Sequence, residues 1–194
     1  KRRYRCWKRG GHGSMNLHDA LVHSCDVYFN QVGKQLGVDT IAEYSRRFGL
    51  GQPTGIALTN EKPGLIPTSE WKKRRFNEPW YSGETLSVAI GQGFVLTTPL
   101  QMANVIAMVA NDGVLLRPQY VRRVESPHGE IVEQLEPEVI GDAGLRRSTL
   151  HQIREALRDV VNGRRGTGKK SKLPNIDVGG KTGTAQVFKM GRKA

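Results

Sequence analysis

Short apolar runs are the feature that most constrains how this chain can fold. The longest wholly apolar run, Val105–Ala110, is far below the ~20 residues that a membrane-spanning helix needs. The 194 residues, 37% of them hydrophobic, are enough for one domain with a packed core. The sequence therefore predicts one globular domain and no transmembrane helix between residues 1 and 194.

The spacing of apolar residues predicts five helices, which begin near Asn16, Tyr28, Asp39, Thr98 and Ser148. Ser24 lies seven residues after Leu17, on the apolar face of the first helix, and is expected to point towards protein or a cleft. Residues 50–84 contain four prolines and little periodicity, which indicates a long loop. Strands are expected at 114–116, 120–124, 131–135 and 176–188, the last with glycines that suit close approach by a ligand.

Basic residues exceed acidic residues by 12, and half of them lie in three clusters, at 1–10, 72–75 and 164–172. Such an excess suggests a polyanionic partner, although solvated loops are the simpler explanation. A module that binds single-stranded nucleic acid, with aromatic residues beside Lys72–Arg75, is one hypothesis. No zinc-finger, RRM or helix-turn-helix signature supports it.

Two cysteines, Cys6 and Cys25, flank His12 in the sequence. A disulfide, a metal site and free thiols are all compatible with this pattern. The spacing matches no standard zinc finger, but Cys6, His12 and Cys25 could hold a structural zinc ion with a fourth ligand from elsewhere. Such a site would hold the N-terminal loop against Ser24 and Asp26.

Two short motifs carry polar groups that could take part in catalysis. Ser24-Cys25-Asp26 stands between two predicted helices, and Lys181-Thr182-Gly183-Thr184 stands in the last predicted strand. The Ser24 hydroxyl can both donate and accept a hydrogen bond, so it can relay a proton. Lys181 brings a positive charge that favours an anionic substrate, and the threonine hydroxyls suit a carboxylate.

With these motifs in this order, the chain resembles the transpeptidase domain of class B penicillin-binding proteins. It is most similar to the elongation type, penicillin-binding protein 2, from about Cys6 to Val187. The resemblance rests on segments with characteristic sequences: Gly11–Gly13, Ser24–Phe29, Phe48–Gly51, Glu70–Lys72, Pro79–Trp80, Ala89–Gly93, Thr98–Ala103, Asn111–Gly113 and Gly180–Ala185.

The resemblance implies an α+β fold of the penicillin-binding transpeptidase and serine β-lactamase type. A helical subdomain would carry the serine triplet, an antiparallel sheet would carry Lys181-Thr182-Gly183 at its edge, and the active cleft would lie between them. The implied enzyme is a serine-type D,D-transpeptidase of the D-Ala-D-Ala carboxypeptidase class. It cross-links peptidoglycan stem peptides through a serine acyl-enzyme, is acylated by β-lactams and requires no cofactor for its chemistry.

The family nucleophile lies in an S-x-x-K motif upstream of the serine triplet, and no such motif precedes Ser24. Residues 1–194 are therefore expected to be a partial, inactive transpeptidase domain. The S-x-x-K region would lie before residue 1, and the final strands and helix after residue 194. Ser69-Glu70-Trp71-Lys72 fits the motif, but it follows the triplet and lies in the predicted loop, so we do not expect it to be the nucleophile.

By resemblance, Ser24, Asp26 and Lys181 are the catalytic candidates, while Thr182, Gly183 and Thr184 bind substrate. Asp26 stands where the wider family usually has Asn, so it can only accept hydrogen bonds when ionised. The expected partners are stem peptides, β-lactams, a membrane-associated glycosyltransferase and the elongation machinery, with no nucleic acid. The expected location is the periplasmic face of the inner membrane, with an anchoring helix outside this chain. A non-catalytic penicillin-recognising sensor is an alternative.

Overall fold

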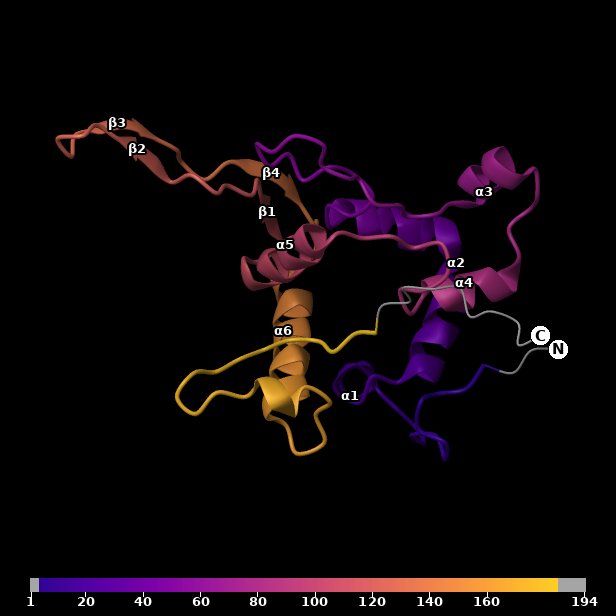
Figure 1. Cartoon of the computed structure of the whole chain (residues 1–194). Helices are drawn as coiled ribbons and strands as arrows, with labels where there is room; N and C mark the ends of the chain where they lie inside the picture. Colours follow the sequence, from indigo (N-terminus) through magenta and orange to yellow (C-terminus); the bar gives the residue numbers. More distant parts are fainter. Residues whose placement is uncertain (1–3, 185–194) are drawn as a thin grey trace, which may run out of the picture.

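The computed structural model describes residues 4–184, and it mixes helices with two small antiparallel sheets (Figure 1). The elements in chain order are α1 (Leu17–Val22), α2 (Asp26–Arg47), α3 (Ser69–Phe76), α4 (Ser82–Val88), α5 (Pro99–Ala110), β1 (Val114–Leu116), β2 (Arg123–Glu125), β3 (Ile131–Gln134), β4 (Val139–Asp142), α6 (Arg147–Asn162) and the 3-10 helix η1 (Lys169–Ser171). Among the described residues, no helix is long and apolar enough to cross a bilayer. The expected α+β class is confirmed.

Side-chain caps fix two of the predicted helix starts. The Asn16 side chain accepts a hydrogen bond of 2.8 Å from the backbone N–H of Asp19 at the start of α1. At α5, Thr98 and Gln101 form a reciprocal capping box, and Pro99 occupies the first helical position. The helices predicted from Tyr28 and Asp39 are the two parts of α2, and a kink separates them at Gly37, whose φ of 79° is not helical.

The long loop predicted over 50–84 is wrong in its second half, where α3 and α4 form. Thr68 caps α3 by accepting a hydrogen bond of 3.0 Å from the N–H of Trp71. The sequence of α3 is largely charged, and its only buried residue is Lys72. An apolar stripe is the signal on which helix prediction depends, so its absence explains the error.

Lys72 is buried because acidic and aromatic groups surround its ammonium. The side chain is 3% exposed, and its Nζ lies 2.6 Å from Glu84 Oε1 and 3.5 Å from Glu78 Oε2. The Tyr81 ring lies 4.1 Å from the same nitrogen. Lys72 thereby joins α3 to α4.

The two sheets differ in burial. β1 and β4 pair beside α5, where Met108, Leu115 and Ala143 form a buried cluster. β2 and β3 form a hairpin that reaches away from the body of the molecule, and all of their residues are exposed (Figure 1). Strands are therefore confirmed near 114–116 and 131–135, while the strand predicted at 120–124 is shifted to Arg123–Glu125.

The strand predicted at 176–188 does not form over its described part, 176–184. Residues 185–188 lie outside the described residues. The segment is instead held by α6, since the Gly180 N–H donates to Leu157 O at 3.0 Å and Asn162 Nδ2 donates to Val178 O at 2.8 Å. This helix also packs against α1, so one element supports both halves of the predicted site.

Helices α2 and α4 approach closely at Gly33, where a Cβ atom would lie 2.4 Å from Ala89 Cβ. We expect Gly33→Leu to lower the free energy of unfolding by about 1–3 kcal/mol, because overpacking outweighs the gain in helix propensity. Thermal unfolding of the full-length gene product measures the change. Lys34→Leu, at an exposed position on the same helix turn, is the matched control. Equal melting temperatures for the two variants would contradict this packing.

Candidate active site

A cleft of about 900 Å³ collects the residues that the sequence singled out. Its walls come from the N-terminal loop, the α1–α2 junction, the turn after α4 and the chain that follows α6. The lining residues are Arg5, Cys6, Trp7, Leu21, Ser24, Asp26, Phe29, Ala89, Ile90, Gln92, Thr167, Lys181, Thr182, Gly183 and Thr184. All six predicted catalytic and substrate-binding residues are therefore in one cleft.

Ser24 occupies a strained position at the end of α1. The helix stops at Val22, and the N–H groups of Ser24 and Cys25 bond back to Leu21 O at 3.3 Å and Ala20 O at 2.9 Å. These two bonds form a Schellman motif, in which the left-handed residue is usually glycine. Ser24 takes this place with a φ of 51°. The expectation that Ser24 continues the apolar face of the helix is wrong, but the turn does direct it into the cleft.

Asp26 is the first residue of α2, and its carboxylate contacts the N-terminal loop. Its Oδ2 accepts a hydrogen bond of 3.2 Å from the backbone N–H of Trp7. The Trp7 indole Nε1 donates to the carbonyls of His23 at 3.1 Å and Ser24 at 3.0 Å. Trp7 therefore fastens the loop to the serine triplet. No local pattern in the sequence predicts this role, because the contacts span 16 to 19 residues.

Lys181 is brought to Ser24 from 157 residues away in the sequence. Its Nζ donates to Ser24 Oγ, to Thr182 O at 3.0 Å and to Thr182 Oγ1 at 3.3 Å. These acceptors match the three N–H donors of an ammonium group. Desolvation lowers the pKa of Lys181, and the Asp26 carboxylate acts in the opposite direction. Since Lys181 only donates, Ser24 accepts this bond and keeps its own proton for another partner.

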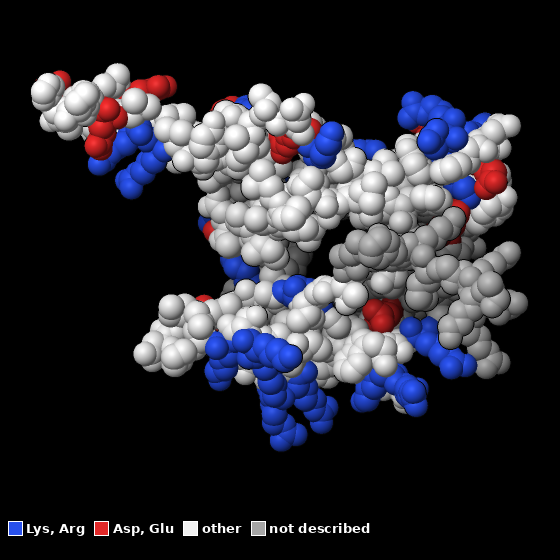
Figure 2. Space-filling view, viewed as in Figure 1, with Lys and Arg blue, Asp and Glu red and all other residues white. Residues whose placement is uncertain are grey.

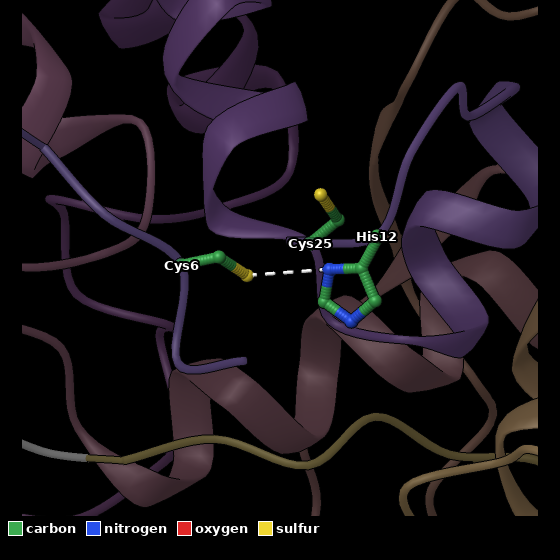
Figure 3. Close-up of side chains that lie close together, drawn as sticks. All are labelled: Cys6, His12 and Cys25. Atoms are coloured by element: carbon green, nitrogen blue, oxygen red, sulfur yellow. Dashed lines mark hydrogen bonds between the residues drawn. The ribbon is translucent and has the colours of Figure 1, made fainter. Parts of the chain in front are cut away.

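Cys6, His12 and Cys25 converge beside the cleft (Figure 3). Their ligand atoms lie within 4.8 Å of one another, with Cys6 Sγ 3.4 Å from His12 Nδ1. Both cysteines are free thiols in the structure. Burial raises the pKa of the Cys25 thiol and lowers the pKa of His12, so desolvation favours the neutral form of each. A neutral imidazole and two sulfur atoms are donors that zinc accepts, after loss of the thiol protons.

Ser69 lies outside this cleft, although the motif that contains it is helical. It is the first residue of α3, which corrects the loop expected there. Its hydroxyl donates to Asp39 Oδ2 at 2.7 Å, while Lys72 Nζ bonds to Glu84. Ser69 and Lys72 are therefore engaged with different carboxylates rather than with each other.

The basic clusters differ in their surroundings. Lys72 is buried, so its charge does not face a nucleic acid. The Trp71 ring packs edge-on against Phe94 at 5.1 Å, so it is not available for stacking on a base. In contrast, Arg164, Arg165, Lys169 and Lys170 are exposed after α6. Figure 2 shows basic side chains gathered along the lower edge of the face that it draws.

Comparison with known proteins identifies the family of this chain. The family model of the penicillin binding protein transpeptidase domain matches residues 1–194. The peptidoglycan D,D-transpeptidase MrdA of Haemophilus influenzae is 38% identical over 97% of this chain and 29% of the relative. The MrdA protein of Acinetobacter baumannii is 40% identical over 95% of this chain and 27% of the relative. The chain thus spans less than a third of the length of these curated relatives.

Solved structures show the same fold. Penicillin-binding protein 2 of Pseudomonas aeruginosa, in complex with WCK 5153, matches with a TM-score of 0.84 and 36% identity over 95% of this chain and 41% of that chain. The Helicobacter pylori protein in complex with MreC matches with a TM-score of 0.82 and 34% identity over 96% and 33%. The fold is therefore that of the penicillin-binding transpeptidase domains. The chain belongs to the penicillin-binding protein transpeptidase family.

Proposed function

We propose that the full-length protein is a peptidoglycan D,D-transpeptidase that works through a serine acyl-enzyme. The observation that carries the proposal is the contact of the Lys181 ammonium with the Ser24 hydroxyl, in a cleft shared with Thr182 and Thr184. The similarity to proteins named peptidoglycan D,D-transpeptidase supports the same reaction. Residues 1–194 are part of the catalytic domain. The S-x-x-K nucleophile precedes residue 1, and closing strands and a helix follow residue 194.

The reaction proceeds in two acyl transfers. The nucleophilic serine oxygen attacks the carbonyl of the penultimate D-Ala, and the C–N bond to the terminal D-Ala breaks. The serine proton leaves with the D-Ala amine. An amine of a second stem peptide then attacks the ester, so that an amide forms, the C–O bond breaks and the serine recovers a proton.

The described residues have distinct roles in these steps. Ser24 passes a proton to the leaving amine, because its oxygen accepts from Lys181 and so does not spend the hydroxyl proton on that bond. Lys181 supplies positive charge, and Asp26 accepts a hydrogen bond from the N-terminal loop. The terminal carboxylate binds beside Thr182, where the Thr184 hydroxyl donates to it, while Gly183 leaves room for the peptide along the chain. The Thr184 N–H stabilises the developing oxyanion.

Acylation by a β-lactam tests the proposal directly. The full-length gene product is incubated with a penicillin, its intact mass is measured and the adduct is mapped to a peptide. The expected result is one adduct, on a serine that precedes Lys1. The same penicillin after hydrolysis of its ring is the control. Absence of an adduct, or an adduct on Ser69, would contradict the proposed enzyme.

We further propose a place in the cell for this enzyme. One solved relative is a complex with MreC, and another carries the description of a peptidoglycan synthase complex that coordinates polymerization and crosslinking. These descriptions support partners from the elongation machinery, including a membrane-associated glycosyltransferase. The corresponding location is the periplasmic face of the inner membrane.

We also propose a structural zinc ion held by Cys6, His12 and Cys25 with a fourth ligand from elsewhere. The ion would fix the N-terminal loop and, through Trp7, the backbone carbonyl of Ser24 and the side-chain carboxylate of Asp26. It would supply folding energy rather than reaction chemistry.

Metal analysis of the full-length gene product checks the zinc proposal. We expect about one zinc per chain, and a lower zinc content and melting temperature for His12→Ala. His128→Ala, an exposed histidine in the β2–β3 turn, is the control. A metal-free protein whose melting temperature is unaffected by His12→Ala would contradict the proposal.

A further inference from the structure

Thr167 reaches the cleft from a turn that packs tightly on the end of α6. A Cβ atom at Gly166 would lie 2.3 Å from Val160 O, and one at Gly168 would lie 3.1 Å from Val160 Cγ1. The Gly168 N–H also donates to Val160 O at 2.8 Å. Because the two glycines let the chain lie against the helix, the Thr167 side chain is directed between α1 and the Lys181–Thr184 segment.

The Thr167 hydroxyl contacts both halves of the site. It donates to the carbonyl of Val22, the last residue of α1, at 3.3 Å. It also lies 3.1 Å from Thr182 Oγ1. The Val22 carbonyl is one of the groups that a helix end leaves without an intrahelical partner, so this hydroxyl supplies it with a donor. One oxygen atom thereby links the turn that carries Ser24 to the residue beside Lys181.

The number of protons fixes the direction of the hydrogen bonds. A hydroxyl has one proton, and Thr167 uses it on Val22 O. The proton between the two threonines must then come from Thr182. Thr182 Oγ1 is left as an acceptor towards Lys181 Nζ, 3.3 Å away. The bonds therefore run in one direction, from Lys181 to Thr182, from Thr182 to Thr167 and from Thr167 to Val22.

We infer that Thr167 is a positioning residue of the acyl-transfer site. By taking the single proton of Thr182, it holds the Thr182 oxygen towards the Lys181 ammonium and keeps that ammonium on Ser24. This inference rests on the proposed function, since Lys181 and Ser24 matter here only if they act in acyl transfer. Thr167 itself does not touch the reacting atoms.

The test compares acylation rates of full-length variants with a fluorescent penicillin. Thr167→Val keeps the shape and removes the hydroxyl, and we expect the second-order acylation rate constant to fall about three- to tenfold, the loss typical of one neutral hydrogen bond. Thr167→Ser retains the hydroxyl and is expected to restore most of the rate. Thr149→Val, in the first turn of α6 and away from the cleft, is the matched control. Should Thr167→Val be unstable in thermal unfolding, Thr167→Ala removes the same hydroxyl with less bulk on the side chain.

A double-mutant cycle separates positioning from a purely structural effect. In a Thr182→Ala background the link to Lys181 is already absent, so Thr167→Val is expected to cause little further loss of rate. An equal loss in both backgrounds would overturn the inference, as would equal rates for wild type and Thr167→Val. These failures would leave the proposed function standing. Failure of the wild type to be acylated would overturn both.

Discussion

Lys181→Ala is expected to slow acylation of the full-length gene product by a β-lactam about a thousandfold. The change removes the donor that contacts Ser24 and Thr182, together with the positive charge that faces an anionic ligand. Positioned proton transfer alone contributes about 10²–10⁴ in rate. The second-order acylation rate constant, measured with a fluorescent penicillin, reports the loss.

Lys170→Ala is the matched control for this prediction, because Lys170 is exposed in η1 and does not line the cleft. If Lys181→Ala is acylated within a factor of about three of the control rate, Lys181 has no part in the mechanism. So small a loss of rate is less than the loss expected from removing one hydrogen bond to a charged group.

The pH dependence of the acylation rate tests the role of the Lys181 charge separately. Desolvation lowers the pKa of Lys181 from its ordinary value. If the ammonium is the active form, acylation falls as the pH rises through this lowered pKa. Lys181→Arg keeps its charge at every accessible pH, so the alkaline decline is expected to disappear even where the absolute rate is lower.

Ser24→Ala has the second largest expected effect, a loss of about a hundredfold in acylation rate. The hydroxyl accepts from Lys181 and provides a proton, and alanine can do neither. Because alanine is no better suited than serine to a φ of 51°, the melting temperature should barely change. Ser148→Ala, at an exposed position in the first turn of α6, is the control.

Ser24→Gly separates the hydroxyl from the strained backbone. Glycine is the usual residue at this place in a Schellman motif, so the variant is expected to gain about 1 kcal/mol in the free energy of unfolding while being as slow as Ser24→Ala. A variant that is faster than Ser24→Ala would show that the backbone turn matters and the hydroxyl does not.

The sequence predicted those elements whose signals are local. The caps at Asn16 and Thr98 are read from neighbouring residues, and both are formed in the structure. Helix α3 was not predicted because its buried residue is a lysine, held by carboxylates from beyond its own end. The expectation that Ser24 continues the apolar face of the first helix is wrong, because a serine in the left-handed conformation has no local sequence signal.

In the candidate site too, local motifs were predicted and long-range contacts were not. The motifs around Ser24 and Lys181 stand out in the sequence, and the resemblance supplied their roles. Their joining depends on α6, which packs on α1 and holds the segment before Lys181. Trp7 and Thr167 were not singled out, since each acts through backbone carbonyls and one distant side chain. Such contacts depend on the tertiary fold and leave no pattern in the sequence.

The measurement that tests the central claim most directly is transfer of an acyl group to an amine. The full-length gene product is supplied with a stem peptide that ends in D-Ala–D-Ala and with a second peptide that carries a free amine, and products are identified by mass. The account predicts release of D-Ala and a cross-linked product, both lost in Lys181→Ala. An acyl-enzyme that forms but never passes its acyl group to the amine would contradict the account and indicate a penicillin-recognising sensor.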